Sequence, residues 1–409
     1  MNYLVLFSRD VVGIICGLFS SVFVARHLGP EIYGSYVFII LVLSYFQNFG
    51  HFRVSVSILP YLKNNPEHEK IIFPLAFVFN GLMAVITSLA LIAISSLFGL
   101  FNNYSSWIYL LLALMIFGEF YLTLITYILS FQSKFKWLTV LVNLRVIIQT
   151  AGFAWIYFYT SEKTVFPYLV VNASTIMLAV LLGIFLIRDY INLSFLQYGK
   201  LNLKLYFKTS LMFYLTDIVT FFSSKGIATV VAAKLAMSNL AYFSMIFTHF
   251  ELLRFPNNTL GTMMFPVLSK ETNDKKQRRY ILHKIRFNFF IYVPIFIATY
   301  LLYPKLVILF YGQEYEIITH YFPFLLFIGA PYLIVYPIIH YFSSNGVPQY
   351  EGLIKLFSIL IQITGVLLFI YLKDFSLLSA VLSQAFGFIG FTIALLVIYK
   401  YSKFNQSSA

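Results

Sequence analysis

Nine charged side chains lie inside stretches of sequence that are otherwise apolar over the thickness of a bilayer. The cations are Arg9, Arg53, Arg145, Lys225 and Arg254, and the acids are Asp10, Asp217, Glu119 and Glu251. Burying a charge in hydrocarbon is costly, so such residues normally face a polar interior and mark substrate or ion pathways. Because the cations exceed the acids by one, a cavity that they lined would suit an anionic group such as a phosphate or pyrophosphate. The acids are candidates for ion coupling, since a carboxylate can alternate between pairing and protonation.

Each of these residues also has a purely structural interpretation, and the sequence leaves the choice open. Glu251 and Arg254 are three residues apart on one helical face and would pair with each other. Arg9 and Arg53 lie near the expected ends of helices, where long cationic side chains reach toward the interface. Arg145 is different because it lies mid-span with no acid within one helical turn.

Other kinds of chemistry leave no signature in this chain. There is no Walker A sequence, no Cys/His metal pattern and no G-x-S-x-G motif. The single cysteine, Cys16, excludes an intramolecular disulfide and a cysteine metal cluster. We therefore expect no catalytic residue, no metal and no cofactor, and the protein is predicted not to be an enzyme. The 46 Phe and 31 Tyr are interpreted as mostly lipid-facing side chains.

The composition predicts an all-α integral membrane protein. Of 409 residues, 60% are hydrophobic and 11% are charged, whereas soluble domains carry about 25% charged residues. Continuous apolar runs of about 20 residues are typical of transmembrane helices. About twelve are expected, at 4–25, 35–61, 72–101, 106–130, 138–160, 166–187, 209–233, 240–266, 287–311, 320–343, 352–372 and 376–400. No connection is long enough for a folded extramembrane domain.

Basic residues orient these spans, because cytoplasmic loops of membrane proteins are enriched in Lys and Arg. With the N-terminus inside, the cytoplasmic connections and the C-terminal tail hold eighteen basic residues and the opposite connections hold five. The eighteen are Lys63, Lys70, Lys134, Lys136, Arg188, Lys200, Lys204, Lys208, Lys270, Lys275, Lys276, Arg278, Arg279, Lys284, Arg286, Lys355, Lys400 and Lys403. Both termini are therefore predicted to be cytoplasmic, in an inner (cytoplasmic) membrane. The net charge of +13 is explained by topology, and no nucleic-acid partner is expected.

A weak internal repeat divides the chain into two halves. At an offset of 207 residues, "VARHL" (24–28) falls on "VAAKL" (231–235) and Asp10 falls on Asp217. The offset spans six helices, so both copies would have the same orientation in the membrane. We expect an N-terminal lobe at 1–200 and a C-terminal lobe at 201–409, related by a parallel pseudo-two-fold axis, which is a transporter architecture. In the first span, Gly13 and Gly17 form a GxxxG motif, which permits close helix approach.

Between the first two expected helices, "ARHLGPEIYGSYVFI" (25–39) resembles the hallmark of Wzx-type flippases. These proteins are the polysaccharide-transporter branch of the multidrug/oligosaccharidyl-lipid/polysaccharide exporter superfamily. Similar matches follow in the family's order at "YLTDIV" (214–219), "FPVLSK" (265–270) and "PKLVILFYGQEY" (304–315). One departure is "LAMSNLAYFS" (235–244), where relatives more often read Val-Gly-x-Tyr. Length and helix count agree with the family over essentially the whole chain.

The resemblance implies a V-shaped, two-lobed bundle that works by alternating access. Its substrate would be an undecaprenyl-diphosphate-linked oligosaccharide, such as an O-antigen (lipopolysaccharide) or capsule repeat unit. The sugar and diphosphate would cross from the cytoplasmic to the periplasmic leaflet through a polar, cationic cavity while the lipid tail stays in the bilayer. H⁺ or Na⁺ is a possible coupling ion, and a polysaccharide polymerase and a chain-length regulator are possible partners. The alternatives are a multidrug or small-molecule antiporter of the same superfamily and, less favoured for want of a large periplasmic loop, a membrane polysaccharide polymerase.

Overall fold

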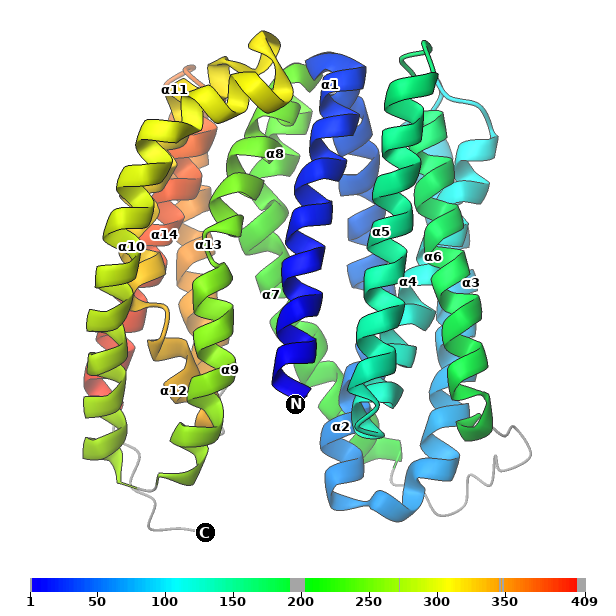
Figure 1. The fold of residues 1–409 in the computed structure, drawn as a ribbon, viewed down its shortest axis with the longest axis vertical. Coiled ribbons are helices and arrows are strands. Elements are labelled where there is room, and N and C mark those ends of the chain that lie inside the picture. Colours follow the sequence, from blue (N-terminus) through cyan, green and yellow to red (C-terminus); the bar gives the residue numbers. More distant parts are fainter. Residues whose placement is uncertain (1, 192–202, 272, 346, 348, 403–409) are drawn as a thin grey trace. The chain divides into compact units, whose positions relative to one another are not determined.

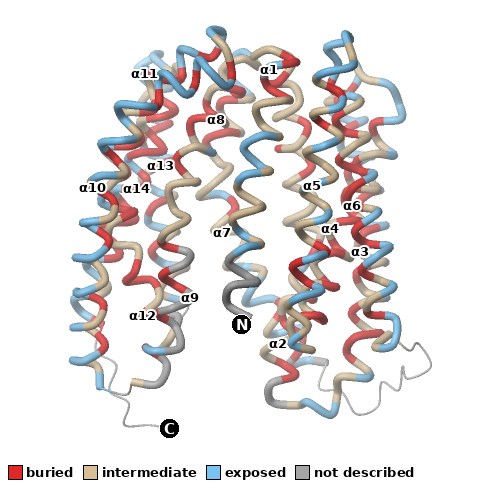
Figure 2. The backbone as a smooth tube through the Cα atoms, in the orientation of Figure 1, coloured by how far each residue is buried: buried red, intermediate tan, exposed pale blue. Residues whose placement is uncertain are grey.

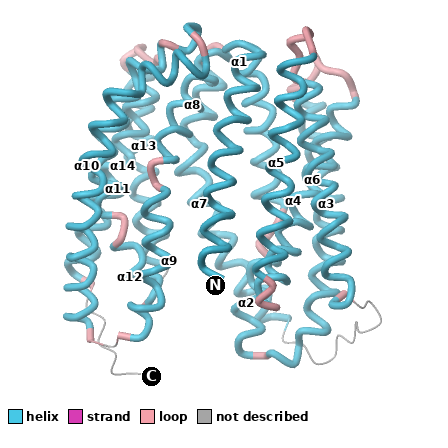
Figure 3. Tube along the Cα trace, in the orientation of Figure 1, coloured by secondary structure: helices cyan, strands magenta, loops and turns pink. Residues whose placement is uncertain are grey.

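The computed structural model describes residues 2–191, 203–271, 273–345, 347 and 349–402. These residues form helices joined by short turns, and no strand occurs among them (Figure 3). The first half contains α1 (Asn2–Gly50), α2 (Val54–Asn64), α3 (Glu69–Leu97), α4 (Trp107–Phe131), α5 (Phe135–Tyr159) and α6 (Phe166–Ile187). The second half contains α7 (Leu203–Lys234), α8 (Met237–Leu252), α9 (Phe255–Lys270), α10 (Asp274–Tyr311), α11 (Ile317–Val335), α12 (Ile338–Ser344), α13 (Gln349–Tyr371) and α14 (Leu377–Tyr401). Single 3₁₀ turns lie at Pro66–His68, Arg188–Tyr190 and Gln313–Tyr315.

Ten helical segments of the described chain are long and apolar enough to cross a membrane, so the protein is an all-α, multi-pass membrane protein. The difference from the twelve expected spans lies at helix breaks. Two expected spans are joined in α1, while the span expected at 240–266 is split into α8 and α9, each too short to cross alone. The joint inside α1 is Gly29, whose φ of 72° and ψ of 168° are not helical. Glycine reaches positive φ without steric cost, and Pro30 then restarts the helix without needing an N–H partner.

The chain forms two compact units, which we call unit 1 and unit 2. Unit 1 contains the residues up to Leu28 together with Ile39–Ile218, and unit 2 contains Gly29–Phe38 and the residues from Val219 onward. The polypeptide therefore passes between units inside α1 and inside α7. The expected lobe boundary at 200/201 lies outside the described residues, so the division into 1–200 and 201–409 stays a prediction.

Unit 1 is built around α4, which packs against α3 and α6, while α5 packs on α6 (Figures 1 and 2). Small residues bring α4 and α6 together. A Cβ atom on Gly118 would lie 2.7 Å from Ile176, and one on Gly183 would lie 2.7 Å from Ile125. Close backbone approach at glycine is a common way to pack helices in lipid, where apolar burial between helices gains little.

Unit 2 is built around α14, which packs against α11 and α13. Aromatic rings fill the junction between α8, α11 and α14. Phe250 stacks on Phe388 with ring centroids 4.8 Å apart, and Tyr332 stacks on Phe388 at 4.7 Å. In contrast, α10 leaves large apolar side chains such as Phe290, Leu301 and Leu309 mostly exposed. Such a face suits contact with lipid tails.

The segment that carries the family resemblance lies against the start of α8 in unit 2. Gly34 is so close to the backbone carbonyl of Met237 that any side chain would clash with it. The ring of Tyr33 meets the ring of Tyr315 edge-on at 6.5 Å. Burial raises the pKa of the Tyr315 hydroxyl, so it stays protonated. By contrast, no atom lies within 4 Å of a Cβ built on Gly13 or Gly17.

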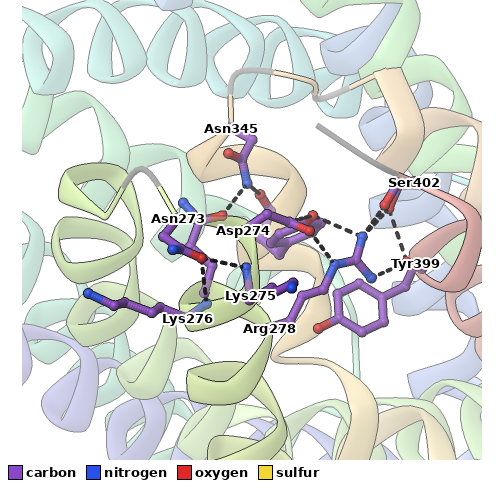
Figure 4. A network of polar contacts seen from close by, with 10 residues as sticks. Asn273, Asp274, Lys275, Lys276, Arg278, Asn345, Tyr399 and Ser402 are labelled. Carbon is purple, nitrogen blue, oxygen red and sulfur yellow. Dashed lines mark hydrogen bonds and ion pairs between the residues drawn. The ribbon is translucent and has the colours of Figure 1, made fainter. Parts of the chain in front are cut away.

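A polar cluster ties the start of α10 to α12 and to the end of α14 (Figure 4). Arg278 pairs with Asp274 at 2.9 Å and donates to the backbone carbonyls of Tyr399, at 2.7 Å, and Ser402. Its guanidinium lies over the rings of Tyr341 and Tyr399, at 5.2 and 4.7 Å from their centroids. The sequence counted Arg278 only as a topology signal, but in the fold it satisfies carbonyls at the C-terminal end of α14.

Candidate functional site

The site in unit 1 begins at a break in the second expected span. Between α1 and α2 the backbone of Phe52 and Arg53 is left-handed, with φ of 47° and 53°. This conformation is strained for residues other than glycine and persists only where the surroundings hold it. A helix break also frees carbonyl groups, and each needs another donor.

One face of α7 supplies those donors. Tyr206, Ser210 and Tyr214 are spaced four residues apart and therefore share a helical stripe. Their hydroxyl groups donate to the carbonyl oxygens of Val54 at 2.7 Å, Phe52 at 2.5 Å and Phe49 at 3.1 Å, respectively. We call these three residues the α7 hydroxyl stripe. The stripe holds the break and so fixes the side chains that flank it.

Arg53 and Asp217 meet at this break. The Arg53 Nε lies in ion-pair contact with an oxygen of Asp217, one turn beyond the hydroxyl stripe on α7. Both side chains are about 30% exposed. Arg53 is the N-cap residue of α2, so it lies at a helix end, as the sequence suggested. Asp217 belongs to unit 1 in the fold, although the repeat placed it in the second lobe.

A half-enclosed cavity of about 200 Å³, which we call the unit-1 cavity, opens beside the break. Its lining residues are polar except for one ring: Gln47, Asn48, His51, Arg53, Glu119, Phe120 and Thr123. Glu119, on α4, faces Arg145 of α5 with Nη1 and Oε2 3.7 Å apart. Arg145 therefore has an acidic partner on a neighbouring helix, although none lies within a turn of it in the sequence.

Arg9 and Asp10 pair with each other near the start of α1. The guanidinium of Arg9 donates to Oδ1 of Asp10 from Nε at 2.9 Å and from Nη2 at 2.7 Å. Neither residue lines the unit-1 cavity. Their side chains are 30% and 46% exposed, so the pair lies on a surface of unit 1.

Unit 2 has a matching arginine at the break between α8 and α9. Arg254 donates to Oε2 of Glu251 at 2.5 Å and to the hydroxyl of Tyr336 at 2.9 Å. Its guanidinium also lies over the rings of Tyr332 and Tyr336, 5.6 and 5.0 Å from their centroids. The freed carbonyl of Leu253 accepts from the hydroxyl of Tyr292 at 2.7 Å. Arg254 is therefore held in a fixed position by an acid and two aromatic rings.

A smaller cavity of about 90 Å³, the unit-2 cavity, is lined by residues of α7, α8, α11, α13 and α14 beside Arg254. The residues are Thr220, Ser223, Ser224, Phe247, Glu251, Arg254, Tyr332, Tyr336, Lys355, Ser358, Gln384, Phe388 and Phe391. Lys355 reaches into this group: its Nζ lies 2.7 Å from Glu351 and donates to the hydroxyl of Thr220 at 3.0 Å. The sequence assigned Lys355 to a cytoplasmic loop, which is wrong because α13 begins six residues before it.

Charges around the unit-2 cavity leave one positive charge in excess. Among the lining residues Arg254 and Lys355 are the cations and Glu251 is the acid, while Glu351, outside the lining, pairs with Lys355. Lys225 lies on α7 within electrostatic range of Glu251. A small cavity with fixed guanidinium, ammonium and hydroxyl donors is suited to the oxygens of an anion.

The two cavities are both small. Both are smaller than the roughly 300–1,000 Å³ of pockets that enclose a drug-sized ligand, so each can hold one group of a larger molecule. Among the described residues no cluster of three His, Cys, Asp or Glu side chains is placed to bind a metal ion.

Sequence reasoning missed the residues that carry no charge. Tyr206, Tyr214, Tyr292 and Tyr336 hydrogen-bond to carbonyls or to Arg254, although the tyrosines were interpreted as mostly lipid-facing. The one sequence feature that could have indicated the tyrosines of α7 is the four-residue spacing of the α7 hydroxyl stripe. Amides such as Gln47 and Gln384 gave no signal at all, because a lone amide in an apolar run is equally compatible with a helix contact.

The chain is similar in fold to solved transporters of the MOP superfamily. A multidrug-resistance MATE-family transporter in an inward-facing conformation has a TM-score of 0.75 at 16% identity, covering 98% of this chain and 97% of its own. The lipid II flippase MurJ, in an inward closed conformation, has a TM-score of 0.70 at 19% identity, covering 98% and 87%. A MOP-superfamily transporter from Pyrococcus furiosus Vc1 has a TM-score of 0.63 at 16% identity, covering 98% and 94%.

Sequence comparison defines the family. No curated protein sequence matches the chain significantly. A family model described as "Polysaccharide biosynthesis protein" matches residues 23–320, which is well over half of the chain and includes the segment around Gly34. The chain is therefore a member of the polysaccharide biosynthesis protein family with the fold of MOP-superfamily transporters.

Proposed function

We propose that this protein is a flippase that moves undecaprenyl-diphosphate-linked oligosaccharide repeat units from the cytoplasmic to the periplasmic leaflet of the inner membrane. It would do so by alternating access and without catalysing a covalent step. The family supports a role in polysaccharide biosynthesis, and one structural neighbour is a flippase for a lipid-linked substrate. The proposed substrates are O-antigen and capsule repeat units.

The observation that carries the proposal is the unit-2 cavity. Its excess positive charge complements the negative charge of a diphosphate, and Arg254 presents a planar fork of donors that matches two phosphate oxygens. The diphosphate would compete with Glu251 for Arg254, while Lys355 and Thr220 contribute further donors. A cationic drug would meet charge of its own sign in this cavity, which disfavours the multidrug-antiporter alternative.

Ion coupling follows from the same competition. Asp10, Asp217, Glu119 and Glu251 each hold an arginine in this structure. Protonating such a carboxylate, or binding Na⁺ to it, would release the arginine toward an anionic substrate. Glu251 is the acid that we assign to this role first, because its arginine lines the unit-2 cavity. A polysaccharide polymerase and a chain-length regulator remain proposed partners.

The test is a deletion strain complemented with variants at matched protein levels. We expect the deletion to accumulate undecaprenyl-linked glycan and Arg254→Ala to fail to clear it, with partial recovery in Arg254→Lys. Lys305→Ala, at an exposed position on α10, is the control and should complement fully. If the deletion instead only made the cells sensitive to amphipathic cations, the protein would be a multidrug antiporter and not a flippase. Full clearance by Arg254→Ala would refute the role of the unit-2 cavity.

A further inference from the structure

We propose that the unit-1 cavity is a sugar-binding subsite that recognises one carbohydrate ring of the lipid-linked substrate. The inference rests on the proposed flippase function, and it assigns a specificity role to Gln47, Asn48, His51 and Thr123. Gln47, Asn48 and Thr123 were not among the ionisable candidates found in the sequence. Four observations support the assignment: the balance of charge, an unsatisfied histidine, two oriented amides and the size of the cavity.

The charges at the unit-1 cavity cancel. Arg53 is paired with Asp217, and Glu119 is paired with Arg145. The cavity is therefore polar but close to neutral, unlike the unit-2 cavity with its excess positive charge. A neutral ligand rich in hydroxyl groups fits such a lining, because hydroxyls both donate and accept hydrogen bonds. A phosphate would gain no net attraction there.

His51 is the clearest sign that a ligand is needed. Its side chain is buried, with 4% of its surface exposed, and lines the cavity. Within the described chain neither ring nitrogen makes a hydrogen bond of normal geometry. Leaving a buried polar group unsatisfied costs about 1–3 kcal/mol. A neutral imidazole offers one donor and one acceptor, and a ligand hydroxyl would have to displace part of the wall to reach them, because both nitrogens are buried.

Two amides beside His51 are already oriented. Gln47 donates its Nε2–H to the carbonyl of Met115 at 3.2 Å, and Asn48 donates its Nδ2–H to the carbonyl of Ser44 at 2.9 Å. Each bond fixes one end of the amide and leaves the amide oxygen as an acceptor. Thr123 adds a hydroxyl from α4. Pre-oriented polar side chains of this kind provide specificity in ligand sites at low entropic cost.

The size and the walls of the cavity fit one ring. A volume of about 200 Å³ corresponds to roughly seven water molecules at about 30 Å³ each, which suits a single sugar but not a chain of several. The ring of Phe120 contributes an apolar wall and meets the imidazole of His51 edge-on at 4.8 Å. The α7 hydroxyl stripe holds the adjacent backbone, so the wall is rigid.

The experiment compares two lipids on the purified full-length protein in nanodiscs. One probe is the lipid-linked oligosaccharide extracted from cells that lack this protein, and the other is undecaprenyl diphosphate without sugar. Thr123→Val and Asn48→Leu keep the branching of the side chain but remove hydrogen-bonding groups. We expect each to weaken binding of the sugar-bearing lipid by about tenfold, as expected for the loss of a hydrogen bond to a ligand hydroxyl. Binding of undecaprenyl diphosphate should be unchanged.

Arg254→Ala provides the matched comparison, because it should weaken binding of both lipids. Retained binding of undecaprenyl diphosphate by Thr123→Val and Asn48→Leu also shows that these variants are folded. If the two variants bind both lipids as the wild type does, or lose both equally, the sugar subsite is refuted while the flippase stands. If the wild type binds neither lipid, the proposed function itself fails.

Discussion

Each of the four acids predicted to lie inside the membrane forms an ion pair with an arginine. The sequence identified these residues because charges are rare in long apolar runs, and it identified the Glu251–Arg254 pair from its spacing. It could not identify Arg53–Asp217 or Glu119–Arg145, because those partners meet only when separate helices pack. Lys355 was misassigned for a related reason. It lies close to the start of its helix, where hydropathy does not separate a loop cation from a cavity cation.

At the residue scale, the Arg53–Asp217 pair is expected to stabilise the fold. Asp217→Asn should lower stability by about 1–3 kcal/mol, because it leaves a half-buried guanidinium without a compensating charge. Replacing both partners, in Arg53→Met with Asp217→Leu, should cost less than Asp217→Asn alone. The measurement is the apparent Tm of each purified variant in detergent. Equal or greater loss in the double variant would show that the pair is not coupled.

At the element scale, the helix breaks are what hydropathy could not predict. The span expected at 35–61 reads as one apolar run, yet it contains a left-handed break at Phe52 and Arg53. That break depends on hydroxyl groups of α7, more than 150 residues away in the chain. Helix existence and approximate position followed from local apolar runs, whereas the interruptions followed from tertiary contacts.

The α7 hydroxyl stripe gives a prediction for this element. Tyr214→Phe and Ser210→Ala each remove the donor to a freed carbonyl of the break, so each should destabilise the protein by about 1 kcal/mol. Tyr371→Phe is the matched control, because Tyr371 is 82% exposed at the end of α13. Apparent Tm values of the three variants decide the matter. If Tyr371→Phe lowered the apparent Tm as much as the stripe variants do, the stripe would have no special role in stability.

The glycines of α1 give a second prediction at this scale. Gly34→Ala should be strongly destabilising, because the new methyl group would clash with the rigid backbone carbonyl of Met237. Gly13→Ala should be tolerated, since nothing lies within 4 Å of that position, and it should even favour the helix slightly. Expression level and monodispersity on size exclusion report the difference. Equal tolerance at both positions would contradict the close approach of Gly34 to α8.

At the scale of the whole molecule, composition and apolar runs predicted the all-α membrane fold, and the "ARHLGPEIYGSY" motif predicted the family. Both are confirmed. The substrate, the two lobes at 1–200 and 201–409, and the orientation stay predictions. Gly29–Phe38 belongs to unit 2 although the rest of α1 belongs to unit 1, which no local sequence pattern could have indicated.

The orientation can be measured with single cysteines in a Cys16→Ser background. Positive-inside bias places the connection between α3 and α4 outside and the connection before α10 inside. Asn103→Cys should therefore react with a membrane-impermeant maleimide in spheroplasts, and Lys276→Cys should react only after permeabilisation. Both positions are exposed. The reverse labelling pattern would invert the predicted topology.

The most direct test of the central claim is flipping by the purified protein in proteoliposomes. The probe is the lipid-linked oligosaccharide extracted from the deletion strain, and its appearance in the opposite leaflet is read by an externally added glycosidase or lectin. We expect rapid flipping by the wild type and by Lys305→Ala, and loss of at least about tenfold in rate for Arg254→Ala, which removes charge-assisted hydrogen bonds to the diphosphate. Flipping no faster than in protein-free liposomes, by a wild-type protein shown to be folded, would contradict the account.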